Sequence, residues 1–567
     1  MAGCYRCTLN LSIRLSIATH SPKWCPIEVC NPLETETRSA LSDRGVYCCR
    51  KPPNTLPLAG NGLVFLQDRQ KLFSWFVKCE GQFGRETFQI AVPTLHPGIV
   101  INDPKNLDYV FKNEGMFSKG DFVKQRSWDL FGDGIINADG KLWKAQRKAG
   151  SHFLNPPNLR ILTDVALPRY LSRSVEYLKD RAKEGAVVDM QFVFHDVTSL
   201  LMGKMAYDME MRADDDFTKA FEHASGVVTE RFQNPLWFIT EIFTGASFRK
   251  SVAIVRKFGM AIVNNAAQDG GKSTQIHSEE SDDTAEQKDK LGEVSGSLIQ
   301  SLFTALGAQQ KLIADAALTY LTAGRDTTAQ ALTWCLYLLM QNKTAMEKIR
   351  EEAQTLLGAQ ELDPQRHLND GGDEGDSDTP TAIFSPTSLP YAMAVFYETI
   401  RLYPPIPFEI RQCEQATTLP DGTFLPKKAV VVWSLWAMNR SRLTWGEDAD
   451  VFRPERWLTE DGKLTTKSAS EFPVFCEFHI SIHLPPESSS QNMIIGYCNV
   501  TNANQDGGPR TCLGKRMAEI IVTQVIATMV LLFDFTPAYE GERVSKTSLT
   551  LPMKDGLPCH VDIRGHG

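Results

Sequence analysis

Helical hydrophobic patterns dominate this sequence, which predicts a mainly α fold with a small β-rich part. Residues 167–267 have helical apolar spacing throughout, with breaks near Asn234-Pro235 and at Gly245. The longest helical pattern, residues 295–341, predicts two helices separated near Gly307. A further apolar helix is predicted over residues 517–535. The short runs 88–92 and 98–101 predict a β-hairpin, Asp103-Pro104 predicts the start of a helix over 105–112, and the β-branched run 428–435 predicts a strand.

Length and composition indicate a globular protein that works in a reducing compartment. The 567 residues suffice for several ordinary domains or for one unusually large domain. A hydrophobic content of 42% and a charged content of 23% are ordinary, and a formal net charge of −8 argues against a nucleic-acid binder. Six of the 13 cysteines lie within the first 49 residues, and the scatter of the others is typical of a reducing environment.

The N-terminal region differs from the rest of the chain. Residues 1–50 are predicted to form a poorly structured leader, and a proline-rich, extended hinge follows at 51–57. No secretory signal is predicted, because the apolar stretch 9–18 is short and interrupted by polar residues. No membrane-spanning helix is predicted either, because the apolar run 517–535 is also interrupted by polar residues. A metal cluster of the leader cysteines is an alternative without helical or strand context, and it would comprise Cys4, Cys7, Cys25 and Cys30.

A cysteine flanked by glycines lies near the C-terminus, in the segment 507–514 with the sequence GGPRTCLG. Glycines let the backbone approach a flat ligand closely. Because an apolar helix is predicted to follow directly, its dipole favours the thiolate form of Cys512. A lone thiolate is the proximal ligand that haem iron needs for O–O cleavage. An isolated cysteine is more often a buried free thiol in a turn, but the G-x-R-x-C-x-G spacing favours haem ligation.

A second polar segment, AGRDTT at residues 323–328, lies inside the predicted helix that ends near Gln341. A glycine followed by an acid and two β-branched alcohols weakens a helix interior, so a simple kink is one interpretation. Oxygen chemistry also needs protons at a distal oxygen, and a carboxylate beside a hydroxyl can relay them from water. Asp326 and Thr327 are therefore candidate catalytic residues.

Two further pairs have helical spacing. Trp143 and Arg147 lie four residues apart on one helix face, which also fits an amphipathic helix with a surface arginine. Glu398 and Arg401 share a face at i and i+3, a pairing so common that it carries little weight alone. The segment RPERW at 453–457 follows about fifty residues later and contains Arg456.

In this order and spacing, the four motifs resemble those of the cytochrome P450 family over roughly residues 51–567. The resemblance implies the mainly helical cytochrome P450 fold with a small β-rich lobe, as one domain, with haem between the oxygen-activation helix and the cysteine loop. It implies haem b with Cys512 as the axial thiolate, and Asp326 and Thr327 as the proton relay. It implies cofactor contacts from Trp143, Arg147, Arg411, Gly508, Arg510 and Gly514, and a structural triad of Glu398, Arg401 and Arg456. Arg325 and Arg350 are expected to be exposed.

The reaction implied by this resemblance is monooxygenation driven by NADPH: one oxygen atom of O2 enters a C–H bond and the other leaves as water. Electrons would come from a separate reductase, because the chain has no flavin or nicotinamide motif, and Lys515 and Arg516 could help to dock it. The family resemblance also implies the cytosolic face of the endoplasmic reticulum membrane, although no anchor helix is predicted and a cytosolic location remains open.

Substrate class is indicated by the sequence 323–329, AGRDTTA, together with Asp133-Gly134-Ile135. These segments look like the fungal and plant branch of the family that hydroxylates fatty acids or alkanes. A tailoring oxidase of fungal secondary metabolism is the alternative enzyme. A catalytically inactive product of a mis-spliced or mispredicted gene is the alternative from another class.

That last alternative arises from an unusual segment, residues 476–505, ahead of the cysteine loop. The family signature begins with a phenylalanine three residues before Gly508, a place that Gln505 occupies here. Without 476–505, Phe475 would join Asp506 and complete the signature. We therefore expect the segment to displace Phe475 from Cys512, and a chain lacking it to bind haem better. Two acidic, glycine-rich stretches, 269–293 and 369–386, are predicted to be flexible loops.

Overall fold

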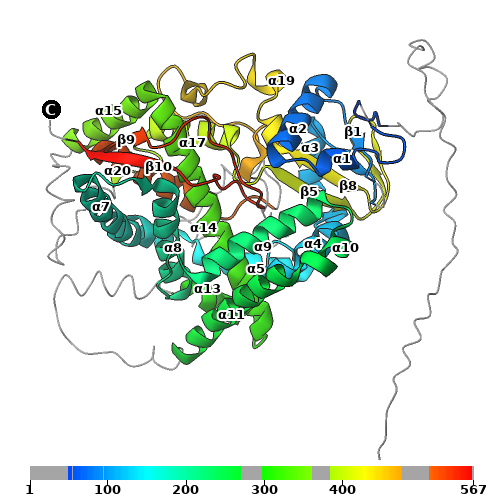
Figure 1. The fold of residues 1–567 in the computed structure, drawn as a ribbon, viewed down its shortest axis with the longest axis horizontal. Coiled ribbons are helices and arrows are strands. Elements are labelled where there is room, and N and C mark those ends of the chain that lie inside the picture. The colour runs from blue at the N-terminus through cyan, green and yellow to red at the C-terminus, as the bar shows by residue number, and fades with distance from the viewer. Residues whose placement is uncertain are drawn as a thin grey trace, which may run out of the picture. The chain divides into compact units, whose positions relative to one another are not determined.

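Helices make up most of the chain, and the strands gather into small sheets (Figure 1), as the sequence predicted. The computed structural model describes residues 49–53, 55–92, 95–269, 296–359, 383–475 and 510–564, all within the unit Tyr47–Gly567. The first helices are α1 Gly62–Phe65, α2 Arg69–Phe83, α3 Pro104–Lys112, α4 Gly120–Phe131, α5 Gly140–Phe153, α6 Pro156–Ile161, α7 Leu167–Lys183, α8 Met190–Tyr207, α9 Asp216–Gln233, α10 Trp237–Thr244 and α11 Ala246–Asp269. The others are α13 Ser297–Leu306, α14 Gln310–Gln341, α15 Lys343–Ala359, α17 Pro390–Leu402, α18 Leu435–Met438, α19 Arg442–Trp445 and α20 Lys515–Leu532.

The described strands form three sheets. The largest has the order β1-β2-β8-β5-β3, and it joins the N-terminal hairpin to strands that follow α17. A three-stranded sheet has the order β4-β10-β9, and β6 pairs with β7. In Figure 1 the five-stranded sheet lies with α1, α2 and α3 on the right, and β9 and β10 lie with α20 on the left. The strands are β1 Phe88–Ile90, β2 Gly98–Val100, β3 Phe117–Ser118, β4 Val188–Asp189, β5 Phe408–Cys413, β6 Thr417–Thr418, β7 Phe424–Leu425, β8 Val430–Ser434, β9 Phe533–Pro537 and β10 Pro558–Ile563.

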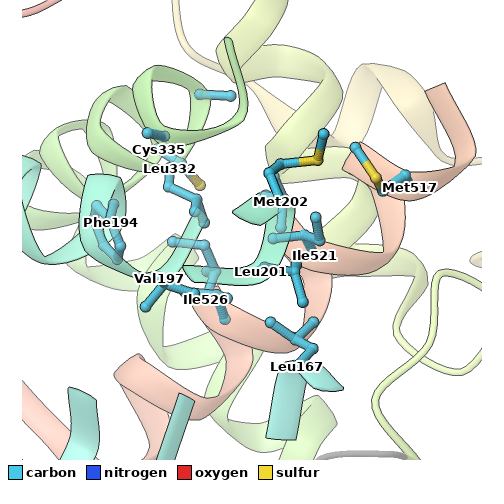
Figure 2. Close-up of a cluster of buried hydrophobic side chains, with 14 of the residues drawn as sticks. Leu167, Phe194, Val197, Leu201, Met202, Leu332, Cys335, Met517, Ile521 and Ile526 are labelled. Atoms are coloured by element: carbon cyan, nitrogen blue, oxygen red, sulfur yellow. The ribbon is translucent and has the colours of Figure 1, made fainter. Parts of the chain in front are cut away.

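Helix α14 is the central element of the fold. It packs against α8, α11, α13, α17 and α20, and nearly all of its residues from Ile313 to Met340 are buried. A helix that is apolar on all sides belongs in a protein interior. Figure 2 shows the contact at which side chains from α8, α14 and α20 meet, among them Met202, Leu332 and Ile521. These three helices therefore form the core that holds the cysteine loop, which immediately precedes α20.

Several sequence predictions are confirmed by the described elements. The hairpin forms with Phe88 opposite Val100, and Asp103 caps α3 by accepting a hydrogen bond from the Lys105 amide at 3.0 Å. Gly307, at φ 65°, separates α13 from α14. Polypeptide in this left-handed region favours glycine, which explains the break.

Other predictions were wrong in detail. Residues 167–267 are not helical throughout, because β4 and residues 208–215 interrupt them. The predicted helix 517–535 ends at Leu532, and Phe533 begins β9, where its side chain is fully buried. The AGRDTT segment produces no break, since α14 runs continuously through it. The leader up to residue 48, the loops at 270–293 and 369–382, and 476–505 lie outside the described residues.

Glu398 on α17 is the centre of a fully buried ion network. Arg401 donates to both of its carboxylate oxygens, at 2.8 Å each, and Arg456 donates to one of them at 3.0 Å. Trp457 Nε1 and the Arg453 amide complete the set of donors. Arg401 also binds the carbonyls of Asn439, Ala449 and Val451. The network thus joins α17 by hydrogen bonds to the segment 439–457, which contains α19.

None of the helices within the described ranges has the length and apolar character needed to cross a membrane. The run that begins at Lys515 is instead a core helix, because its face toward α14 and its remaining sides are almost entirely buried.

Removal of one partner from the Glu398 network is predicted to be costly. Arg401→Met should lower the free energy of unfolding by about 3–5 kcal/mol, because it removes a positive charge and two hydrogen bonds from the buried Glu398 carboxylate and the Arg401 donors from three backbone carbonyls. Lys348→Met is the control, because its bridge to Glu455 is exposed and worth about 0–1 kcal/mol. Urea unfolding followed by circular dichroism measures both. Similar losses in the two variants would contradict a stabilising role for the network.

Candidate active site at the cysteine loop

One face of α14 is uncovered although the helix lies in the core. Between Ile313 and Met340 every residue is buried except Tyr320, Ala323, Gly324 and Thr327. Their spacing of i, i+3, i+4 and i+7 places them on one helix face. All four line the same internal cavity, which has a volume of about 420 Å³. The AGRDTT segment therefore presents its two small residues and Thr327 to an internal space.

Cys512 lies on the wall of the same cavity, together with Leu513 and Gly514. It precedes α20, whose N-cap is Gly514. Of the six cysteines in the described residues, Cys512 alone lines the cavity. Burial raises the pKa of the Cys79, Cys335 and Cys559 thiols to about 12, so these three are structural thiols in the core.

Phe475 is held against Cys512, contrary to the expectation that residues 476–505 displace it. The Cys512 amide donates to the Phe475 carbonyl at 2.5 Å. The Phe475 ring lies 6.4 Å from the Phe396 ring and lines the cavity. The prediction of displacement was wrong, because aromatic packing and one backbone hydrogen bond hold Phe475 beside Cys512 although the intervening residues are present.

Arg510, two residues before Cys512, is buried and is paired with two acids. Its Nε donates to Glu114 at 2.7 Å and its Nη2 donates to Asp139 at 2.8 Å. Its guanidinium carbon lies 4.7 Å from the centre of the Trp143 ring. Burial alone would raise the pKa of Asp139, but a hydrogen bond from Lys124 and the charge of Arg510 lower it overall. Among the described side chains, Arg510 Nη1 is a buried donor without a hydrogen-bond acceptor.

Trp143 and Arg147 are both buried on α5, as their spacing predicted for one helix face. Arg147 lines the cavity, and burial lowers the pKa of its guanidinium to about 10, with an opposing contribution from the charge of Cys512. Arg411 is placed differently. It lies on β5, where it binds Glu409 at 3.2 Å, and it is not part of the cavity wall. The structure thus places Arg510 against Trp143, with Arg147 one turn further along α5, while Arg411 shares Glu409 with Lys119.

The two candidate relay residues have different environments. Thr327 Oγ1 donates to the Ala323 carbonyl at 2.7 Å and faces the cavity. Asp326 accepts from Arg325 Nε at 2.7 Å, and Arg325 Nη1 donates to Thr218 on α9 at 2.9 Å. The expectation that Arg325 is exposed was wrong, because this pairing buries it. Arg350 is also buried, since it donates to the carbonyls of Val530 and Phe533 and to Asp534.

Comparison with known proteins identifies the family. A sequence model described as "Cytochrome P450" matches residues 51–474, which is well over half of the chain. The chain belongs to the cytochrome P450 family. It is 29% identical to "Cytochrome P450 CYP94D109" from Paris polyphylla over 82% of this chain and 85% of that protein. It is 28% identical to "Cytochrome P450 704B1" from Arabidopsis thaliana, over 90% and 95%. It is 27% identical to "Cytochrome P450 monooxygenase cyp1" from Mycosarcoma maydis, over 92% and 77%.

Membership of the family identifies the reaction class and the cofactor. Cytochromes P450 are haem enzymes of the monooxygenase class in which a cysteine thiolate is the axial ligand, so haem is the cofactor of this protein. The family match ends at residue 474, immediately before residues 476–505. The assignment of the ligand in this cytochrome P450 therefore rests on the geometry around Cys512.

The described residues fit a haem group. The uncovered face of α14 has only small side chains at Ala323 and Gly324, so a flat ligand can approach it closely. Cys512 lies on the wall of the same cavity. The buried, acceptor-free Nη1 of Arg510 suits an anionic group such as a propionate. Gly514, a predicted cofactor contact, lines the cavity, whereas Gly508 lies outside the described residues.

Sequence reasoning missed three residues of this site. Glu114 and Asp139 hold Arg510, and Lys124 binds Asp139 at 2.8 Å. No local pattern singles them out, because they come from three separate segments that only the fold brings together. Trp457 was part of a recognised motif, but its hydrogen bond to Glu398 was not foreseen.

The contact between Phe475 and Cys512 predicts that residues 476–505 are dispensable for haem binding. A chain lacking them should bind haem at least as well as the full chain, because both ends of the segment are fixed by other contacts. Haem content per polypeptide and the Soret shift of the reduced, CO-bound protein measure this. A Gly/Ser-rich segment of equal length is the control for chain length. If only the natural segment allows haem incorporation, it is a working part of the site.

Proposed function

We propose that this cytochrome P450 inserts one oxygen atom of O2 into a C–H bond of a lipophilic substrate, a fatty acid or an alkane. The observation that carries the proposal is the shared cavity of Cys512 and Thr327, one on the thiolate side and one on the uncovered face of α14. Haem bound there through a thiolate supplies O2 activation and O–O cleavage. The surrounding residues bind the cofactor, orient the substrate and deliver protons.

Cys512 is proposed as the axial ligand, since it is the cysteine of the described residues that faces the cavity. Trp143, Arg147 and Arg510 are proposed to bind the propionates through charge-assisted hydrogen bonds. Arg411 is proposed for the same role; it is buried on β5, where its guanidinium donates to Glu409. Glu398, Arg401 and Arg456 are proposed as a structural triad, in keeping with the full burial of Glu398 and Arg401 and with the hydrogen bonds that both arginines donate to Glu398.

Protons are proposed to pass through Asp326 and Thr327. The Thr327 hydroxyl faces the cavity, while Asp326 lies one residue earlier and is anchored by Arg325. Because Asp326 is paired in this arrangement, its carboxylate must exchange Arg325 for water or the hydroxyl to take part in a relay. The Arg325 contact would then regulate how readily Asp326 delivers a proton.

A lipophilic substrate is supported by the remainder of the cavity wall, which is predominantly aromatic and aliphatic. The wall extends from Cys512 to residues of α2, α9 and β8, far along the sequence from the cysteine loop. Apolar pockets of this kind bind ligands mainly by burial of hydrocarbon. Electrons are proposed to come from an NADPH-dependent reductase, with Lys515 and Arg516 beside the cysteine loop as candidate contacts.

The cytosolic face of the endoplasmic reticulum membrane is proposed as the location. Helix α10 presents Phe238, Ile239, Ile242 and Phe243 to solvent, with Ile242 71% and Phe243 81% exposed. Their spacing places them on one side of the helix. An exposed apolar face of this kind suits contact with a lipid surface.

Cys512→Ser tests the proposed ligand. The reduced, CO-bound variant should lose the Soret shift characteristic of thiolate ligation, because a serine oxygen does not replace a thiolate as the axial donor. Cys49→Ser is the control, since Cys49 does not line the cavity. Retention of the shift in Cys512→Ser would exclude Cys512 as the ligand.

Thr327→Ala tests the proton relay. The variant should keep the spectral change on substrate binding but lose coupling of NADPH consumption to product, with more peroxide released. General acid–base contributions of this kind are worth about 10²–10⁴-fold in rate. Thr333→Ala is a matched control, because Thr333 binds the i−4 carbonyl in the same helix, at 2.8 Å, and does not line the cavity. Equal coupling in both variants would contradict the relay.

A further inference from the structure

Arg69, the first residue of α2, lines the cavity that contains Cys512. Only 7% of its surface is exposed. Its Nη1 donates to the Lys546 carbonyl at 2.7 Å, and its guanidinium carbon lies 5.2 Å from the centre of the Phe73 ring. A guanidinium has five N–H donors, so one carbonyl leaves most of them available.

Within the described residues, Arg69 forms no ion pair. Several other buried arginines have carboxylate partners: Arg231 binds Glu241, Arg350 binds Asp534 and Arg401 binds Glu398. Arg126 is also buried without an ion pair among the described residues, but it does not line the cavity. Burial is the cause that lowers the pKa of Arg69 to about 9, and no carboxylate opposes it. At neutral pH the side chain is therefore a buried cation without a counter-ion among the described residues. Such an arrangement is costly unless a ligand supplies the charge.

The other basic side chains of the wall are accounted for. Lys119 lies 3.4 Å from Glu409, Arg147 is one of the proposed propionate donors, and His96 is exposed. Arg69 differs from these residues, because it is buried without a carboxylate partner among the described residues, its ring contact is Phe73, and the same wall includes the apolar side chains of Phe65, Leu72 and Phe408. A charged donor surrounded by hydrocarbon matches a ligand with one anionic end and an apolar chain. The positive end of the α2 dipole adds to this preference for an anion.

We propose that Arg69 binds the carboxylate of a free fatty acid, so that the apolar end of the chain extends along the cavity toward Cys512. This assignment rests on the proposed function and makes it more specific. An alkane has no group for Arg69, and an ester offers only neutral acceptors. Anchoring of the carboxylate at α2 directs oxidation to the part of the chain remote from the carboxyl group.

The expected effect is a difference between ligands. Loss of a charge-assisted hydrogen bond weakens binding by about 10- to 100-fold. Arg69→Met should therefore weaken binding of hexadecanoic acid by about that factor and leave methyl hexadecanoate and hexadecane unchanged. Arg69→Lys should retain part of the preference for the acid, because it keeps the charge but loses the planar fork.

The test is a titration of the haem-loaded protein with these three lipids, followed by the spectral change on binding, and a separate assay of oxidised products. Arg126→Met is the matched control. Arg126 is also buried and binds the carbonyls of Arg231 and Phe122, and it lies outside the cavity wall. The Arg126→Met substitution should change the stability of the protein without changing the ratio of acid to ester affinity.

Equal affinity of the unmodified protein for acid and ester overturns the inference, as does an equal loss for all three lipids in Arg69→Met. If Arg69→Met fails to bind haem, the inference is tested by the lipid affinities of Arg69→Lys and by the ratio of acid to ester affinity in the unmodified protein. Oxidation of hexadecane without a preference for the acid would refute the anchor and leave the proposed function standing. Acid binding that depends on Arg69 without oxidised product would refute the proposed function and leave the anchor standing.

Discussion

A thiol that must stay uncovered inside a packed core is the constraint on which this structure depends. Protein interiors are close-packed, so an internal cavity persists only where rigid elements hold its walls apart. Here the walls are the uncovered face of α14 and the loop that leads into α20. Gly324 meets a second demand, since a Cβ there would lie 2.8 Å from two atoms of Met202 on α8. The absence of a side chain at Gly324 therefore leaves the cavity open on this face of α14 and leaves room for the Met202 side chain of α8.

Rigidity on the cysteine side is transmitted through α17. Glu398 has both oxygens engaged by buried donors, an arrangement whose desolvation cost is acceptable only with such complete hydrogen bonding. The adjacent Tyr397 donates to Glu519 on α20 at 2.7 Å, one turn after the cysteine loop. Burial raises the pKa of Tyr397, and the Glu519 charge adds to this, so the phenol remains a donor. The ion network and the position of Cys512 are thus linked by a short series of contacts.

Sequence alone predicted what is local in this protein. The cysteine loop, the AGRDTT segment and the break at Gly307 are runs of neighbouring residues whose spacing has a direct physical meaning. It did not predict Glu114 and Asp139 around Arg510, or the burial of Arg325 by Asp326 and Thr218, because those contacts join distant segments. The lack of a counter-ion for Arg69 within the described part of the chain is likewise invisible in sequence. A charge without a partner is recognised only when all of its neighbours in space are known.

Residues 476–505 illustrate how contacts rather than chain length determine the geometry of a binding loop. Phe475 is fixed by the Cys512 amide and by aromatic neighbours, while Arg510 is fixed by Glu114 and Asp139. Closing a longer loop between two such points costs little, about 0.6 kcal/mol for each doubling of its length. Each of the two fixed ends has several contacts, and these outweigh that cost. The position of Cys512 is therefore insensitive to the length of the chain that precedes it, provided that both ends keep their partners.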